Sequence, residues 1–138
     1  METENKKTVL IVEDDVALRS VLVEKMTDER FNVLSAADGE LGLAAALEHH
    51  PHLILLDILM PRMDGITMLS KLRSVDTWGK HVNVIVLTNS TDAQTIATVS
   101  GFGATDFLIK SEWSLEALVA RIRERLGDQT PPPATVVS

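Results

Sequence analysis

The chain is organised around one stretch, which reads Leu53-Ile-Leu-Leu-Asp57-Ile-Leu-Met-Pro61-Arg-Met-Asp-Gly65. Its first four residues are apolar and predict a strand buried on both faces, which ends on the carboxylate of Asp57. Pro61 and Gly65 then interrupt the backbone before a segment with helical spacing begins. In a parallel sheet, ligands bind beyond the carboxyl ends of the strands, so Asp57 stands where chemistry is expected.

A second apolar run has the same arrangement. Val9–Val12 predicts another buried strand, and three acids follow it: Glu13, Asp14 and Asp15. A single aspartate at a strand end is most often a solvated residue that merely ends the strand. Acids after two strands of one parallel sheet instead indicate a shared site at its carboxyl edge.

The rest of the chain alternates between apolar runs of strand length and segments with helical spacing. The expected strands are 9–12, 31–35, 53–56, 83–87 and 107–109. The expected helices are 18–26 capped by Asp15, 41–47 after a turn at Asp38-Gly39, 65–74, 92–100, and 114–126 opened by Ser114. The apolar stripe of the first helix includes Val21, and helix 92–100 carries β-branched residues that make it the weakest. Five strands and five helices predict an α/β fold with a parallel, doubly wound sheet and right-handed crossovers.

Length and composition indicate one globular domain. The chain has 138 residues, 45% hydrophobic and 24% charged, and it has no cysteine, which excludes disulfides and thiolate metal sites. The net charge of −7 argues against direct binding of nucleic acid. No apolar run approaches the roughly 20 residues of a membrane span, and the N-terminus lacks a secretory signal, so we expect a cytoplasmic protein. The expected parts are a flexible N-terminus at 1–7, a domain at 8–127 and a disordered, proline-containing tail at 128–138.

Four predicted strands end on polar residues that suit phosphoryl chemistry: Glu13 and Asp14, Asp57, Thr88, and Lys110. Three neighbouring carboxylates repel one another, and a cation among them would relieve this repulsion. Oxygen ligands without histidine or cysteine favour Mg²⁺ or Mn²⁺ over zinc. The lysine and the hydroxyl can hold the remaining oxygens of a phosphate. The pattern therefore fits an aspartate that accepts a phosphoryl group.

These motifs resemble the receiver domain of two-component response regulators. The resemblance covers about residues 8–126, with four motifs in the expected order and spacing. They are Val12-Glu13-Asp14-Asp15, Asp57-Ile-Leu-Met-Pro61 with Asp64-Gly65, Leu87-Thr88, and Gly103-Ala104 through Phe107 to Lys110. The resemblance implies a flavodoxin-like five-stranded sheet of order 2-1-3-4-5, and the length predicts a stand-alone receiver with no fused output domain.

The resemblance also assigns roles at the first and third strand ends. It implies that Asp57 is the phosphoacceptor, that Asp14 binds Mg²⁺ directly and that Glu13 binds it through water. Asp57 and the backbone carbonyl of Leu59 would be further metal ligands. The phosphoryl donor would be a histidine kinase or a phosphotransfer protein.

The remaining strand ends would carry the switch. The resemblance implies that Lys110 holds the phosphoryl group, that Thr88 follows it on activation and that Phe107 is the aromatic that turns inward behind Thr88. The switching face would comprise three elements that bind a downstream protein: helix 92–100, strand 107–109 and helix 114–126. The receiver would act as a monomer or a phosphorylation-dependent dimer. It would be a signalling switch rather than an enzyme, apart from intrinsic Mg²⁺-dependent self-phosphorylation and autodephosphorylation.

Three rival functions are disfavoured by particular residues. A phosphohydrolase with an aspartyl-phosphate intermediate would place a second acid two residues after the nucleophile, where this chain has Leu59. A receiver-like module that is never phosphorylated would lack an acid, the acceptor or the lysine, and this chain keeps all of them. A flavin-binding module would want a phosphate loop rich in Ser, Thr or Gly after the first strand, where Glu13, Asp14 and Asp15 would repel phosphate.

Other residues are expected in ordinary solvated or packing positions: His49, His50, His52, Trp78, Trp113, Arg121, Arg123 and Arg125. Ser111 follows Lys110 where the family usually has proline. A cis bond costs about 3–4 kcal/mol at a residue other than proline, so we expect the Lys110–Ser111 bond to be trans.

Overall fold

The computed structural model describes residues 6–60, 62–89 and 93–127. Several expectations lie outside these residues: most of the N-terminus at 1–7, Pro61, the start of helix 92–100 and the tail at 128–138. Within the described ranges, no helix is long and apolar enough to cross a membrane.

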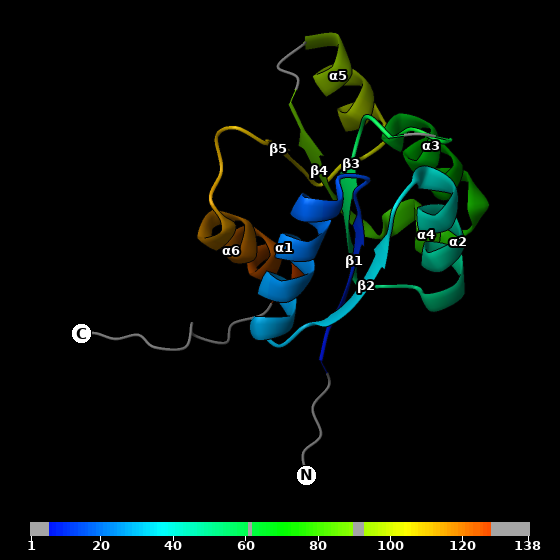
Figure 1. The fold of residues 1–138 in the computed structure, drawn as a ribbon. Helices are drawn as coiled ribbons and strands as arrows, with labels where there is room; N and C mark the ends of the chain where they lie inside the picture. Colours follow the sequence, from blue (N-terminus) through cyan, green and yellow to red (C-terminus); the bar gives the residue numbers. More distant parts are fainter. Residues whose placement is uncertain (1–5, 61, 90–92, 128–138) are drawn as a thin grey trace.

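A five-stranded sheet forms the centre of the fold (Figure 1). Its strands are β1 (Thr8–Val12), β2 (Asn32–Ala36), β3 (Leu53–Asp57), β4 (Asn83–Thr88) and β5 (Asp106–Ile109). They lie in the order β2-β1-β3-β4-β5, and each neighbouring pair is parallel. The predicted α/β class, parallel sheet and strand order are confirmed.

Six helices surround the sheet in the described part of the chain, where five were expected. They are α1 (Val16–Asp28), α2 (Gly39–His49), α3 (Gly65–Val75), α4 (Thr77–His81), α5 (Ala93–Gly101) and α6 (Leu115–Leu126). The helix that the prediction missed is α4, which is too short to show an apolar repeat. It begins where the Asp76 carboxylate accepts a hydrogen bond of 2.7 Å from the Gly79 N–H.

Side-chain caps set where several helices begin. Asp15, Asp38, Asp64 and Ser114 each accept a hydrogen bond from a backbone N–H in the first turn that follows. The expected roles of Asp15 and Ser114 are confirmed. Asp38 was expected in a turn with Gly39, but it caps α2, so this helix begins two residues earlier than predicted.

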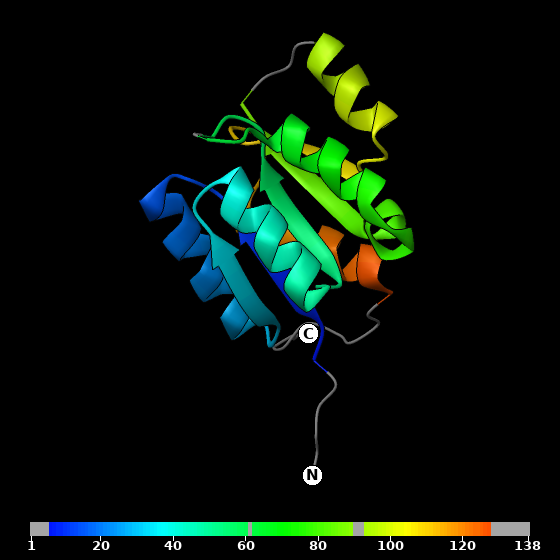
Figure 2. The ribbon, with the colours of Figure 1, turned by 90° about the vertical axis from the view of Figure 1, so that its right-hand side faces the viewer.

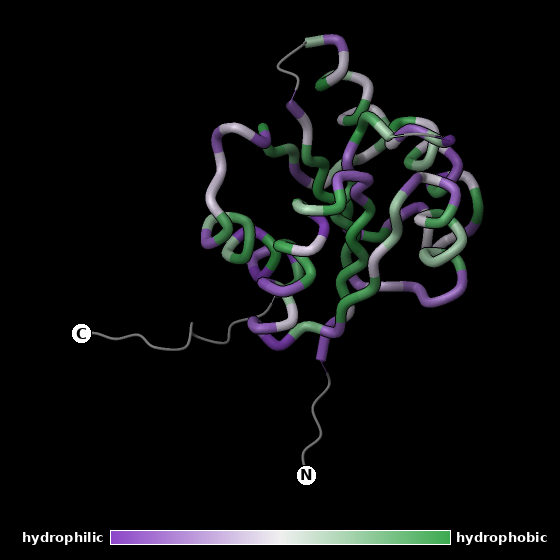
Figure 3. Tube along the Cα trace, viewed as in Figure 1, coloured by the Kyte–Doolittle hydropathy of each residue, from purple (hydrophilic) through white to green (hydrophobic). Residues whose placement is uncertain are grey.

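The sheet is buried on both faces, and side chains of each strand alternate between two core layers. In one layer Leu10, Ile54 and Val84 pack with residues of α2 and α3, such as Leu72. The other layer is formed by the alternate strand residues together with α1 and α6. Figures 1 and 2 show α2 and α3 on one side of the sheet and α1 and α6 on the other. Apolar residues accordingly concentrate in the interior, as Figure 3 shows.

The helices are not equally buried. Met68, Leu69 and Leu72 of α3 have no exposed surface, whereas Val99 is the one buried residue of α5 among those described. The prediction that Val21 faces the core was wrong, because its side chain is 44% exposed. Helix α1 packs on the sheet along a narrower line than its apolar spacing suggested, with Leu22 and Met26 buried.

Candidate functional site

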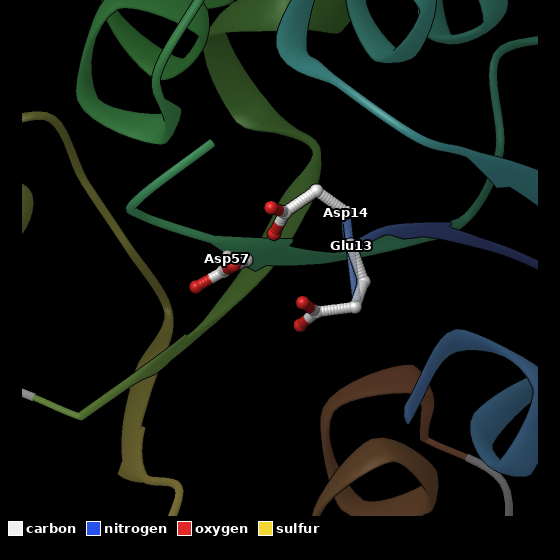
Figure 4. A group of neighbouring side chains, drawn as sticks. All are labelled: Glu13, Asp14 and Asp57. Atoms are coloured by element: carbon white, nitrogen blue, oxygen red, sulfur yellow. The ribbon is translucent and has the colours of Figure 1, made fainter. Parts of the chain in front are cut away.

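Three carboxylates meet at the carboxyl edge of the sheet (Figure 4). Glu13 and Asp14 follow β1, and Asp57 ends the neighbouring strand β3. One carboxylate oxygen from each lies within 4.8 Å of the other two. Glu13 and Asp57 are buried, while Asp14 is exposed. The sequence therefore predicted the acids that the fold brings together.

Lys110 lies against the two buried acids. Its Nζ is 3.2 Å from Asp57 Oδ1 and 3.0 Å from Glu13 Oε1. Apart from this ion pair with Lys110, the buried Glu13 Oε1 has no hydrogen-bond partner among the described residues. The other carboxylate oxygen, Oε2, accepts a hydrogen bond of 3.1 Å from the Asp15 N–H. One lysine thus faces two acids, and negative charge is left in excess.

The pKa values of the site follow from burial and from this charge imbalance. Burial and then the nearby Glu13 carboxylate raise the pKa of Asp57, Lys110 opposes both effects, and the net result is a pKa of about 7. Burial disfavours the charged form of Lys110, but the neighbouring Glu13 and Asp57 carboxylates outweigh this effect and raise the pKa of Lys110. A site that costs this much to ionise favours a bound cation.

Strand β4 ends in Thr88, and Phe107 lies in the neighbouring strand β5, two residues before its end. Thr88 ends β4 one residue beyond Leu87, the register partner of Asp57, and it is only 2% exposed. Its carbonyl accepts a hydrogen bond of 2.6 Å from the Lys110 N–H, which joins the ends of β4 and β5. Phe107 is half-buried and packs against the core layer beneath α3 and α5. All four predicted strand ends therefore lie at one edge of the sheet.

The segment after Asp57 is held close to the acceptor by two glycines. The Gly65 N–H donates a hydrogen bond of 2.7 Å to the Ile58 carbonyl. A Cβ at position 65 would collide with the Asp57 carbonyl, and one at position 39 would collide with the Met63 carbonyl. The Leu59 side chain is 74% exposed on this segment. Gly39 is a supporting residue that the sequence did not indicate.

The arginines of α6 were predicted only in part, because Arg125 is exposed as expected whereas Arg123 is largely buried. Arg121 and Arg125, expected to be solvated, lie 2.7 and 2.6 Å from the carboxylate of Asp106. Arg123 lies 2.7 Å from Glu29 of α1. Near the site, Arg19 Nη1 donates a hydrogen bond of 2.8 Å to the Glu13 carbonyl. Except for Arg19 and Glu13, the paired residues are far apart in sequence, so no local pattern indicated these contacts.

The histidine and tryptophan predictions fared better. His49, His50 and His52 are exposed as expected, although His50 stacks on Trp78 with ring centres 4.1 Å apart. Trp78 and Trp113 are partly buried against the two core layers. None of the described peptide bonds is cis, which agrees with the expected trans Lys110–Ser111 bond.

Comparison with known proteins identifies the protein family that has this fold and this group of residues. The family model of the response regulator receiver domain matches residues 9–123. The chain belongs to this family, whose members act in the signalling of two-component systems. The response regulator ArlR of Staphylococcus aureus is 34% identical over 121 residues, which are 88% of this chain and 53% of that protein. The chain spans about half the length of the curated relatives that it matches first.

Solved structures show the same fold. A CheY-like response regulator receiver domain protein from Methanospirillum hungatei superposes with a TM-score of 0.83 at 26% identity, covering 91% of this chain and 97% of that one. A chain of the CheX-CheY-BeF3-Mg²⁺ complex from Borrelia burgdorferi superposes with a TM-score of 0.77 at 32% identity, covering 86% of this chain and 87% of that one.

Proposed function

We propose that Asp57 accepts a phosphoryl group from a phosphohistidine of a histidine kinase or phosphotransfer protein, in a reaction that requires Mg²⁺. The observation that carries this proposal is the packing of Asp57 between two further acids and Lys110 at one edge of the sheet. Acids alone at a strand end would suit many cations. A lysine in direct contact with the acceptor carboxylate adds a positive group that can neutralise phosphate oxygens.

In the proposed reaction, a carboxylate oxygen of Asp57 attacks the phosphorus of the phosphohistidine. A P–O bond forms as the P–N bond breaks, and the electron pair remains on the imidazole nitrogen, which takes a proton from solvent. Lys110 Nζ, 3.2 Å from Asp57 Oδ1, is placed to neutralise a phosphoryl oxygen. The Thr88 hydroxyl, at the next strand end, would donate to another oxygen once the group is attached.

The residues at this edge fit a magnesium ion. Glu13, Asp14 and Asp57 offer only oxygen ligands, and Glu13 Oε1 is buried without a hydrogen-bond partner among the described residues. We propose that Asp14 and Asp57 bind Mg²⁺ or Mn²⁺ directly, Glu13 through water, and Leu59 through its backbone carbonyl. The ion would neutralise charge on the transferred phosphoryl group. The similar complex from Borrelia burgdorferi contains BeF3 and Mg²⁺, which supports this assignment.

We propose that the phosphorylated state is signalled through α5, β5 and α6. Thr88 ends β4, the neighbour of β5, Phe107 lies in β5 itself, and α5 has a single buried side chain among its described residues, Val99, to resist movement. A Thr88→Ala variant should still accept phosphate at Asp57, but amide exchange in residues 93–107 should no longer change on phosphorylation. Equal changes in Thr88→Ala and in the unsubstituted protein would contradict this coupling.

The remaining assignments belong to the same proposal. The receiver domain would span residues 8–127, between the N-terminal residues 1–7 and the tail at 128–138. It would act in the cytoplasm on a downstream protein target, without direct binding of nucleic acid. It would act as a monomer or as a phosphorylation-dependent dimer.

Labelling with a small phosphodonor such as acetyl phosphate tests the proposal. The protein should gain one phosphoryl group in Mg²⁺ and none in EDTA, and Asp57→Asn should gain none. Asp14→Asn should need about tenfold or more Mg²⁺ for the same labelling. Asp15→Asn is the matched control, because it removes a neighbouring acid but keeps a side chain that can cap α1. Labelling of Asp57→Asn to the normal level would overturn the proposal.

A further inference from the structure

A pocket lies near the amino ends of the strands β3 and β4, whereas the three acids lie at the carboxyl ends of the strands. It has a volume of about 520 Å³ and lies where α2 ends, between α4 and the start of β4. His50, Pro51, Trp78 and Val82 give it an apolar and partly aromatic lining, and Asn83 supplies an amide. The His50 ring stacks on Trp78 with an angle of 7° between the ring planes. Neither ring takes part in the phosphoryl chemistry proposed above.

Grooves lined by aromatic rings are the usual binding sites of proline-rich segments. Such segments are already in the polyproline II conformation, so they lose little entropy on binding, and their rings pack on aromatic side chains. This chain contains one run of three prolines, Pro131-Pro132-Pro133. Between residues 128 and 138 the sequence has a single charged side chain, Asp128, which suits an apolar pocket with histidines at its rim.

The run of prolines follows an element that already touches this pocket. Asn83 Nδ2 donates a hydrogen bond of 3.3 Å to the carbonyl of Arg125, in the last turn of α6. The Val82 N–H donates one of 3.0 Å to the Trp78 carbonyl, which keeps Trp78 close to Asn83. Pro133 lies six positions after Gly127, and six steps of about 3.1 Å span roughly 19 Å. Because the last turn of α6 contacts Asn83 of the pocket lining, this segment starts close to the pocket.

We propose that Pro131–Pro133 bind in this pocket, against Trp78 and His50 of the same molecule. Even a weak contact can be populated, because the prolines belong to the same chain as the pocket and a short tether gives them an effective concentration in the millimolar range. The inference does not depend on the proposed phosphoryl transfer, since the pocket lies near the other ends of the strands. It assigns to 128–138 a docking role in place of the expected free tail.

The test uses the full chain with Trp113→Phe, so that Trp78 is the only tryptophan. Quenching of Trp78 fluorescence by acrylamide is compared between this protein and a second one in which all three prolines are also replaced by serine. With a dissociation constant of about 1 mM and a similar effective concentration, about half of the molecules are docked, so quenching should rise about twofold in the serine variant. The Trp78 indole N–H signal in NMR spectra should shift between the two proteins. Equal quenching and an unchanged signal would overturn the proposal.

A peptide of residues 128–138 provides the second measurement. Added to the serine variant at millimolar concentration, it should restore the low quenching, and the same peptide with serines in place of the prolines should not. If the peptide binds while the two full chains still quench equally, the pocket takes prolines only from other molecules, and the intramolecular proposal is wrong. Labelling of Asp57 should be the same in both chains, so failure here is distinct from failure of the proposed function.

Discussion

Helices α5 and α6 flank the same edge strand, β5, but they are held in very different ways. Helix α6 buries Leu118, Val119 and Ile122 in the core layer that it shares with α1. In the described part of α5 only Val99 is buried, and Ile96 is partly exposed. The two sides of the proposed switching face are therefore unequal in stability before any phosphoryl group arrives.

Charged groups increase this difference. Three arginines of α6 pair with acids elsewhere in the fold, two of them with Asp106 of β5 and one with Glu29 of α1. Helix α5 has no basic residue in its last turn, and its end is held from outside by Arg73 of α3. The comparison shows that α6 is the more firmly held side of the proposed switching face.

Replacing one isoleucine in each of the two helices should give the largest difference in stability between them. Ile122→Ala in α6 should lower the free energy of unfolding by about 2–5 kcal/mol, because Ile122 has no exposed surface. Ile96→Ala in α5 should cost about 1 kcal/mol or less, since its side chain is only partly buried. Urea denaturation followed by circular dichroism measures both. Equal losses would show that α5 is as firmly packed as α6.

Replacement of Arg73 should loosen α5 further. The guanidinium donates to four backbone carbonyls, those of Gly79, Val82, Phe102 and Gly103, at 2.8–2.9 Å. Arg73→Met leaves these acceptors without their donor and should cost about 2 kcal/mol.

The local readout for this variant is amide exchange, which should speed up near Phe102–Ala104 and not in α6. Lys71→Met is the control, because Lys71 is an exposed residue of the same helix. Exchange that speeds up equally in α5 and α6 would show that Arg73 supports the whole fold rather than one end of α5.

The pair of Glu29 and Arg123 should make the attachment of α6 dependent on pH. Hydrogen bonding to Arg123 lowers the pKa of Glu29 in the folded protein. The pair therefore stabilises the fold fully at pH values above the normal pKa of a glutamate. This stabilisation is lost as the pH falls through the lowered pKa of the folded state. At pH 7, Glu29→Gln should cost about 1 kcal/mol. The difference from the unsubstituted protein should shrink as the pH falls below the normal pKa of a glutamate, which melting curves can measure. A difference that is constant with pH would rule out the ion pair as its source.

Loss of Arg121 should give the smallest change. Arg121→Met removes the contact of 2.7 Å with Asp106, but the arginine side chain is 39% exposed and water screens the pair. We expect a cost of about 0.5 kcal/mol at low salt, reduced further in 1 M NaCl. Melting in the two salt concentrations checks this. A salt-independent loss would point to packing of the arginine stem instead of its charge.

The site was more predictable than the packing around it. Glu13, Asp14, Asp57, Thr88 and Lys110 each follow an apolar run, and a parallel sheet brings the ends of such runs to one edge. The short helix α4 was missed because five residues cannot show a helical repeat. The partners of Arg73, Arg121 and Arg123 were missed because each ion pair or hydrogen bond joins segments that only the folded chain brings together.

By itself, the sequence determined the alternation of strands and helices, and with it the edge at which the acids, the threonine and the lysine would lie. Those properties depend on short-range patterns and on the handedness of the crossover connections. Only the tertiary structure decided that one lysine would face both buried acids and that three arginines would secure α6. It also decided that α5 would bury a single side chain in its described part. The pKa values of the site and the stability of each helix depend on how deeply side chains are buried and on distances between remote segments. Burial and these distances cannot be calculated from residues that are neighbours in sequence.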